Sequence, residues 1–164
     1  MNLFVLDRAI SKAAAKHCDV HVVKMCLETA QIVCSALYPR VMPYKATHLH
    51  HPCVVWAAET VGNFVWALDL GYALCEEYKG RYGKEHASLE VLDVCARTRH
   101  PRNSISMTPF ALAMPVQYKR GDAVLSYREY YMSKMENVRD EHLRMRRYHR
   151  QKLSLEKIKR LIAE

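Results

Sequence analysis

Six polar side chains recur along an otherwise apolar stretch, residues 15–38, and together form what we call the polar seam. They step by four and three positions, the spacing that stacks side chains on one helical face: His17, His21, Lys24, Glu28, Gln31 and Ser35. Imidazole, amine and carboxylate groups on one face can transfer protons or attack an electrophile. We therefore predict Glu28, Lys24 and His21 as catalytic residues, and a hydrogen-bonded structural seam is the alternative.

The stretch that carries the polar seam is apolar around the rest of its circumference, which is typical of a helix buried inside a domain. It is expected to end before Pro39, and the chain is expected to kink near His17 and Cys18 if Asp19 caps the helix. Burying a lysine and a carboxylate is costly unless they pair or face a cleft. The seam is therefore expected to line a cleft or meet a partner, with His17 and Asp19 contacting the ligand.

A histidine-rich loop, residues 39–51, follows this helix. His48, His50 and His51 precede Cys53, and imidazole and thiolate are zinc ligands. The spacing H-x-H-H-P-C matches no zinc module, so we predict no metal and no cofactor. Loops over rigid helices often carry function. The predicted ligand-binding residues of the loop are Tyr44, Lys45, His48 and His51, with a solvated loop as the alternative.

The remainder of the chain is predicted to be helical. A long helix over residues 52–82 starts with Pro52 and ends at Gly83, and it would turn Glu59 and Asn63 toward the seam. A helix over residues 84–98 and a short buried helical turn over residues 106–115 follow. Asp122 is expected to cap a last helix from residue 123. Lys119 and Arg128, among interleaved tyrosines, are predicted to contact a nucleic-acid ligand.

Composition sets the fold class and the kind of partner. The 164 residues contain only five glycines and six prolines, which favours one all-α domain over residues 1–134, with a basic helical extension over residues 135–164. A net charge of +8 suits a polyanion, and DNA is the predicted partner. The extension has apolar positions that would allow a homodimer. Six cysteines without a C-x-x-C pair, no signal peptide and no long uncharged stretch predict a cytoplasmic chain without membrane contact.

Several motifs resemble a family of small proteins of phages and large DNA viruses. The motifs are MNLFVLD, CDVHVVKMCLETAQ, THLHHPCVVWAAET, EEYKGRYGKEH and MTPFALAMP followed by QYK. The resemblance covers most of residues 1–131, and the basic extension departs from it.

A second resemblance concerns the polar seam. Asp19-Val20-His21, with Glu28 seven residues after the histidine, is similar to the active helix of phage pyrimidine-dimer DNA glycosylases of the endonuclease V type. Those small, basic, helical enzymes flip a nucleotide and attack the sugar C1′ with an N-terminal α-amine, and a helix glutamate steers the imine. The resemblance implies that Glu28 is the catalytic carboxylate and that His21 shapes the site. The glycosylases have an arginine before the glutamate, where this chain has Leu27.

These observations lead to one preferred function and two alternatives. The preferred function is a DNA glycosylase or lyase that flips a pyrimidine nucleotide. Its nucleophile is either the N-terminal amine or Lys24, if crowding by His21 and burial keep that amine uncharged. The first alternative is a transferase that modifies a substituted pyrimidine of phage DNA. The second is a non-enzymatic protein that binds a nucleotide or nucleic acid.

Overall fold

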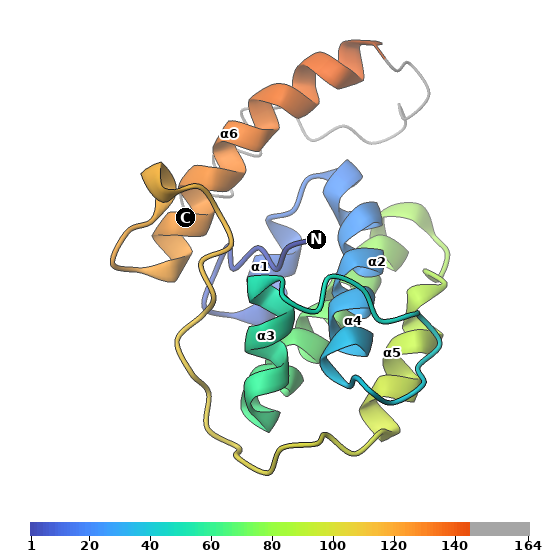
Figure 1. The fold of residues 1–164 in the computed structure, drawn as a ribbon. Helices are drawn as coiled ribbons and strands as arrows, with labels where there is room; N and C mark the ends of the chain where they lie inside the picture. Colours follow the sequence, from blue (N-terminus) through green and yellow to red (C-terminus); the bar gives the residue numbers. More distant parts are fainter. Residues whose placement is uncertain (145–164) are drawn as a thin grey trace.

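The computed structural model describes residues 1–144 and places them in an all-α fold, as the sequence predicts (Figure 1). The helices are α1 (Ile10–Ala15), α2 (Asp19–Ala36), α3 (Pro52–Glu59), α4 (Val61–Tyr82), α5 (Ser88–Arg97), the 3-10 turn η1 (Val116–Tyr118) and α6 (Ala123–Arg144). Within these residues there is no strand. The side chains are described as far as Met135.

Helices α2 and α4 form the centre of the fold. Helix α4 packs against α1, α2, α3 and α5, and α2 also contacts α3 and α5. Their buried faces are apolar, with Val22, Met25, Ile32, Leu70 and Leu74 at most 2% exposed. Each such side chain contributes about 1.5–3 kcal/mol through removal of apolar surface from water. Helix α2 is therefore held rigidly, as a helix that carries reactive groups must be.

The chain breaks between α1 and α2 near His17 and Cys18, as expected, but Cys18 and not Asp19 is the N-cap of α2, and Asp19 is the first residue of the helix. The break leaves carbonyl groups at the end of α1 without helical partners. The Arg81 guanidinium of α4 donates to the carbonyl oxygens of Ala15 (3.1 Å) and His17 (2.7 Å) and binds the Asp19 carboxylate at 3.1 Å. His17 therefore lies in the break and not on α2.

The single helix predicted over residues 52–82 is wrong, because the chain turns at Thr60. Thr60 is extended, with φ −142° and ψ 159°, and its hydroxyl accepts a hydrogen bond from the Asn63 N–H at 3.0 Å. This is the N-cap arrangement that begins α4. Helices α3 and α4 consequently meet at a bend of 120°. Gly83 ends α4 with φ 69°, in the left-handed region where glycine has no steric cost.

The helical turn predicted over residues 106–115 is also wrong. Residues 99–115, which we call the strap, run without helix around the edge of the bundle from α5 to α6 (Figure 1). Pro109 and Pro115 disfavour helix at the residues before them. The strap is instead fixed by side chains. The Thr108 N–H donates to Asn63 Oδ1 at 2.9 Å, and the Tyr127 hydroxyl donates to the Ala111 carbonyl at 2.6 Å.

The first residues form an extended buried arm, residues 1–6. Leu3, Phe4, Val5 and Leu6 are at most 4% exposed. The arm contacts α6, because the Phe4 ring lies against Tyr131 with ring centroids 5.0 Å apart. The N-terminus is therefore brought inside the fold.

Helix α6 starts as the sequence predicts, since Asp122 Oδ1 accepts a hydrogen bond from the Leu125 N–H at 2.9 Å. It docks through the buried residues Tyr127, Tyr131 and Met135 and then extends beyond the bundle (Figure 1). Helix α6 also continues across the domain boundary predicted between residues 134 and 135. The predicted dimer contact of the C-terminal extension lies outside the described residues.

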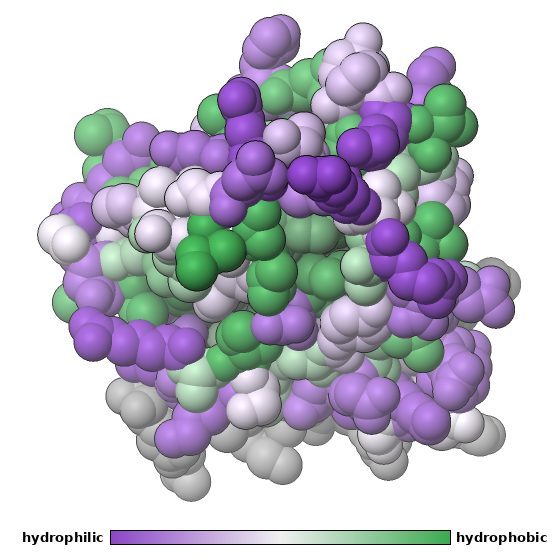
Figure 2. Space-filling model, turned by 90° about the horizontal axis from the view of Figure 1, so that it is seen from below, coloured by the Kyte–Doolittle hydropathy of each residue, from purple (hydrophilic) through white to green (hydrophobic). Residues whose placement is uncertain are grey.

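Two surface properties bear on possible partners. In residues 1–144, no helix by itself combines the length and the apolar character needed to cross a membrane, and α3 and α4 meet that test only as a bent pair. Figure 2 shows an apolar area on the underside of the molecule, bordered by hydrophilic side chains. Exposed apolar side chains of the described residues include Val55, Val65, Ile105 and Met107.

Candidate functional site

A hollow of about 280 Å³ lies where the N-terminal arm crosses α2, and we call it the N-terminal hollow. Four other parts of the chain contribute to it: α2, the start of α3, the strap and α6. The lining residues are Met1, Asn2, Phe4, His21, Lys24, Met25, Glu28, His51, Ala113, Tyr130 and Lys134. All three residues predicted to be catalytic, His21, Lys24 and Glu28, therefore line one hollow.

Among the side chains that the structure describes, Glu28 is the only carboxylate that lines this hollow. Its side chain is 13% exposed, and its two oxygens have different partners. Oε2 lies 3.8 Å from the α-amine of Met1 and accepts a hydrogen bond from the Asn2 N–H at 3.0 Å. Oε1 lies 3.4 Å from Lys24 Nζ, which confirms the pairing predicted from their spacing. The carboxylate thus touches both amines that the sequence singles out as nucleophiles.

Asn2 fixes the position of the N-terminal arm. Its Nδ2 donates to the Ala113 carbonyl at 2.9 Å, and its Oδ1 accepts from the Leu3 N–H at 2.8 Å and from the Cys53 thiol at 3.5 Å. Burial of Cys53 raises the pKa of its thiol to about 11, so the thiol keeps the proton that it donates. The arm is thereby tied to the strap and to α3, and the α-amine is held beside Glu28.

His21 forms one wall of the hollow as an uncharged ring. Its imidazole stacks on Phe4, with centroids 5.8 Å apart and planes 7° apart, and meets the Tyr131 ring edge-on. Burial lowers the pKa of His21 to about 3, and the positive charges of Lys24 and Lys134 act in the same direction. Its Nδ1 is buried without a hydrogen-bond partner in the described residues. The ring therefore meets a ligand only through its remaining edge.

His51 is the one residue of the histidine-rich loop that lines the hollow. Its Nδ1 accepts a hydrogen bond from the Cys53 N–H at 3.2 Å at the start of α3. The neutral ring therefore carries its proton on Nε2. Burial lowers the pKa of His51, as does the charge of the N-terminal amine, and Glu28 opposes both. His51 can thus donate a hydrogen bond from Nε2 to an acceptor.

Two lysines with different surroundings contribute cations to the hollow. Lys24 is 63% exposed, so the burial expected for its side chain is not present. Lys134 of α6 lies over the face of the Tyr130 ring, with Nζ 4.7 Å from the centroid. Lys134 and Tyr130 belong to the run of interleaved aromatic and charged residues that the sequence associates with nucleic-acid contact, and their spacing of four residues places both on one helical face. Nothing in the sequence brings that face to α2.

The other residues predicted to bind a ligand lie away from the hollow. His17 is fully buried, with Nδ1 2.8 Å from the Ala13 carbonyl oxygen, and Asp19 binds Arg81. The Tyr44 hydroxyl lies 3.1 Å from the Ser88 hydroxyl, while Lys45, His48 and Lys119 are exposed.

Glu59 and Asn63 do not face the seam, contrary to the prediction. Asn63 Nδ2 and the Glu59 carboxylate both bind the Thr108 hydroxyl of the strap, at 2.7 Å and 2.9 Å. The turn at Thr60 rotates the helix that carries Asn63, so the two residues secure the strap.

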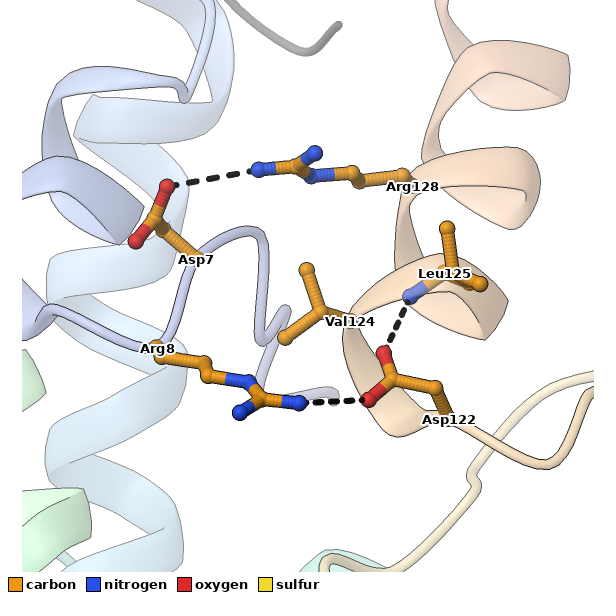
Figure 3. Close-up of a pocket in the computed structure, with 6 residues that line it drawn as sticks. All are labelled: Asp7, Arg8, Asp122, Val124, Leu125 and Arg128. Atoms are coloured by element: carbon orange, nitrogen blue, oxygen red, sulfur yellow. Dashed lines mark hydrogen bonds and ion pairs between the residues drawn. The ribbon is translucent and has the colours of Figure 1, made fainter. Parts of the chain in front are cut away.

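A second hollow, of about 490 Å³, lies where the residues after the N-terminal arm meet the start of α6 (Figure 3). Asp7 binds Arg128 at 3.3 Å, and Arg8 binds Asp122 at 3.3 Å. Arg128 Nε also donates to the Leu6 carbonyl at 2.8 Å. The charges of these four residues are matched in pairs, and Arg128, predicted to bind a ligand, joins α6 to the arm instead.

One group of described residues places three potential metal ligands close together. The ligand atoms of Cys26, Cys75 and His86 lie within 4.8 Å of one another. However, His86 Nδ1 accepts from the Ser88 N–H at 3.1 Å, and the ring also hydrogen-bonds to the Val23 backbone. Both ring nitrogens are therefore engaged, and the two thiols hydrogen-bond to each other. These contacts fit a structural link between α2, α4 and the start of α5.

Comparison with protein-family models, with curated proteins and with solved structures finds no match to this chain. The two resemblances drawn from sequence motifs therefore remain predictions, and the function is argued from the geometry of the N-terminal hollow.

Proposed function

We propose that this protein is a DNA-acting lyase or glycosylase that forms an imine with the deoxyribose C1′ of a flipped pyrimidine nucleotide. The observation that carries the proposal is the α-amine 3.8 Å from Glu28 Oε2 inside a hollow. An amine beside a carboxylate can lose its proton to that carboxylate and then attack carbon.

The chemistry is balanced by these two groups. The amine nitrogen bonds to C1′ as the base leaves with the electrons of the C1′–N bond, and the base takes up the proton that the newly bonded nitrogen loses. The sugar ring then opens: the C1′–O4′ bond breaks, O4′ receives a proton from the Glu28 acid, and the amine nitrogen and C1′ are joined as an imine. At an abasic site the same amine condenses with the C1′ aldehyde and releases water.

The geometry supports the α-amine as nucleophile in preference to Lys24. The α-amine belongs to the arm that Asn2 ties to the strap and to α3, so its position beside Glu28 is fixed, whereas the Lys24 side chain is 63% exposed. The arrangement also tolerates removal of Met1. In that case the amine belongs to Asn2, whose nitrogen lies 3.0 Å from Glu28 Oε2. Lys24 then acts as a cation next to the carboxylate.

The net charge of +8 and the lysines in the hollow support DNA as the partner. A nucleotide must leave the base stack to reach a hollow of this kind. The walls suit a flipped nucleoside, because the Phe4 and Tyr130 side chains contribute aromatic surface to the hollow, while His51 offers a hydrogen-bond donor.

Borohydride trapping tests the proposal. The protein is incubated with duplex DNA that carries an abasic site or a pyrimidine dimer, borohydride is added to reduce an imine to a stable amine, and the adduct is mapped by mass spectrometry. We expect a covalent adduct on the N-terminal residue. Intact mass of the protein before reaction identifies whether that residue is Met1 or Asn2.

Two variants make the trapping result specific. Glu28→Gln removes the proton acceptor and is expected to lower the rate of adduct formation by at least about a hundredfold, within the usual range for a general base. Lys24→Met keeps the carboxylate and the α-amine, and is expected to retain the adduct. An adduct on Lys24 would refute the α-amine as nucleophile. No adduct with either DNA would refute imine chemistry and favour the transferase or the binding protein.

A further inference from the structure

We propose that Lys134, together with Lys24, forms a phosphate site at the N-terminal hollow that holds one phosphodiester of the DNA strand next to the flipped nucleotide. This inference rests on the proposed function for the identity of the ligand. It assigns a role to Lys134, on α6, and it makes α6 part of the DNA-binding surface.

The charge balance of the hollow is the first argument. Among the described side chains, residues 1–135, its lining carries three amines, those of Met1, Lys24 and Lys134, against the single carboxylate of Glu28. One carboxylate neutralises one amine, so an excess of positive charge faces the hollow. An anion of one or two charges balances it, and a phosphodiester carries one. Because the hollow is partly shielded from water, this attraction is stronger than at an open surface.

The position of the two lysines is the second argument. Both line the same hollow as His21, and the positive charge of each lowers the pKa of that imidazole. Burial keeps that ring uncharged, so it adds no third cation to the two lysines. The Tyr130 ring lies 4.7 Å from Lys134 Nζ and restrains the ammonium group through a cation–π contact. In residues 1–135, no carboxylate forms an ion pair with Lys134, while Lys24 pairs with Glu28.

The two lysines also relate differently to the chemistry. When Glu28 takes the proton of the α-amine, it loses its negative charge, and its attraction for Lys24 weakens. Lys24 then has a free charge for the phosphate at the step in which the nucleophile is formed. Lys134 is available throughout. The phosphate site is thus expected to be strengthened at the moment when the amine becomes reactive.

A binding experiment with a substrate that cannot form an imine tests the site. The DNA is a short duplex with a tetrahydrofuran abasic analogue, either with natural phosphates or with a neutral methylphosphonate at one linkage beside the analogue. Fluorescence anisotropy measures the Kd of wild-type protein and of Lys134→Met. We expect Lys134→Met to weaken binding to the natural DNA about tenfold, and to reduce the slope of log Kd against log salt by about one.

The test of the phosphate site is whether the effects of Lys134→Met and of methylphosphonate on Kd depend on each other. At the contacted linkage, methylphosphonate should also weaken wild-type binding about tenfold, but should weaken binding by Lys134→Met clearly less, because one of the two partner charges is already gone. Lys134→Arg keeps the positive charge, so it should bind the natural DNA nearly as well as wild type and should lose affinity for the methylphosphonate DNA as wild type does. Lys84→Met removes an exposed charge that does not line the hollow, and should affect both DNAs equally. Circular dichroism checks that each variant is folded.

The inference is overturned if the losses caused by Lys134→Met and by methylphosphonate multiply at each linkage tested. Trapping and coupling distinguish the two proposals. An adduct with multiplicative losses would leave the proposed function in place and remove the phosphate site. Coupled losses without an adduct would keep the phosphate site and remove imine chemistry.

Discussion

Two buried histidines should make the folded state sensitive to mild acid. Burial lowers the pKa of His17 to about 4 and that of His21 to about 3. In the unfolded chain both regain an ordinary pKa of about 6.5. Below pH 6.5 the two histidines therefore bind protons in the unfolded state but not in the folded state. The free energy of unfolding consequently falls as the pH falls. This loss of stability ends only when the pH falls to the pKa values of the two histidines in the folded state.

The magnitude follows from linkage. Each histidine costs about 1.4 kcal/mol per pH unit within this window, so a change from pH 7 to pH 5 costs about 2 kcal/mol per histidine and about 4 kcal/mol for both. Typical domains have only about 5–15 kcal/mol of stability in total. The lowered pKa values of Asp7 and Asp122 lie below this window and contribute nothing to the loss.

Urea unfolding at pH 7 and pH 5 measures the effect, with His17→Gln as the test variant. Its side-chain amide can still donate to the Ala13 carbonyl oxygen, which lies 2.8 Å from His17 Nδ1. Between pH 7 and pH 5, the free energy of unfolding of the variant should fall by about 2 kcal/mol less than that of wild type, whatever the stability of the variant at pH 7. His50→Gln, at an exposed site, controls for the loss of one histidine. Equal losses in His17→Gln and wild type would refute the assignment to buried, uncharged His17.

Two further predictions concern the elements that position the site, and both are measured by urea unfolding. Arg81→Met should destabilise the protein by about 3 kcal/mol, because it removes the hydrogen bonds and the ion pair that close the break before Asp19. Arg81→Lys should lose only part of this stability, since lysine keeps the charge but lacks the forked guanidinium. Gly62→Ala should destabilise by about 2 kcal/mol, because a Cβ at Gly62 would lie 2.4 Å from the Ile105 carbonyl oxygen and displace the strap. A more stable Gly62→Ala protein would mean that helix propensity outweighs this contact.

Several features of the fold could be predicted from local sequence. The all-α class, the buried helix with its polar seam, the glycine that ends α4 at Gly83 and the Asp122 cap of α6 each depend on residues a few positions apart. The ion pair between Lys24 and Glu28 follows from a spacing of four on a helix. Such features are set by helix geometry and by capping, which act within one or two turns.

The errors arose where distant residues compete with local patterns. The apolar repeat across residues 52–82 favours one helix, but Thr60 caps a new one, and the strap packs against the bend through Gly62. The apolar residues 106–115 of the strap favour a short buried helical turn when read alone. Two prolines, and the hydrogen bonds that Asn63 and Tyr127 make to it, hold it extended.

The sequence by itself determined which reactive groups lie on α2, because His21, Lys24 and Glu28 are neighbours on one helical face. Only the tertiary structure decided what they meet. The arm brings the α-amine to Glu28, the start of α3 brings His51, and α6 brings Lys134 from 106 positions beyond Glu28 (134 − 28 = 106). No local spacing encodes these contacts. They depend on burial of the arm beneath α6, which removes apolar surface from water wherever in the chain that surface lies.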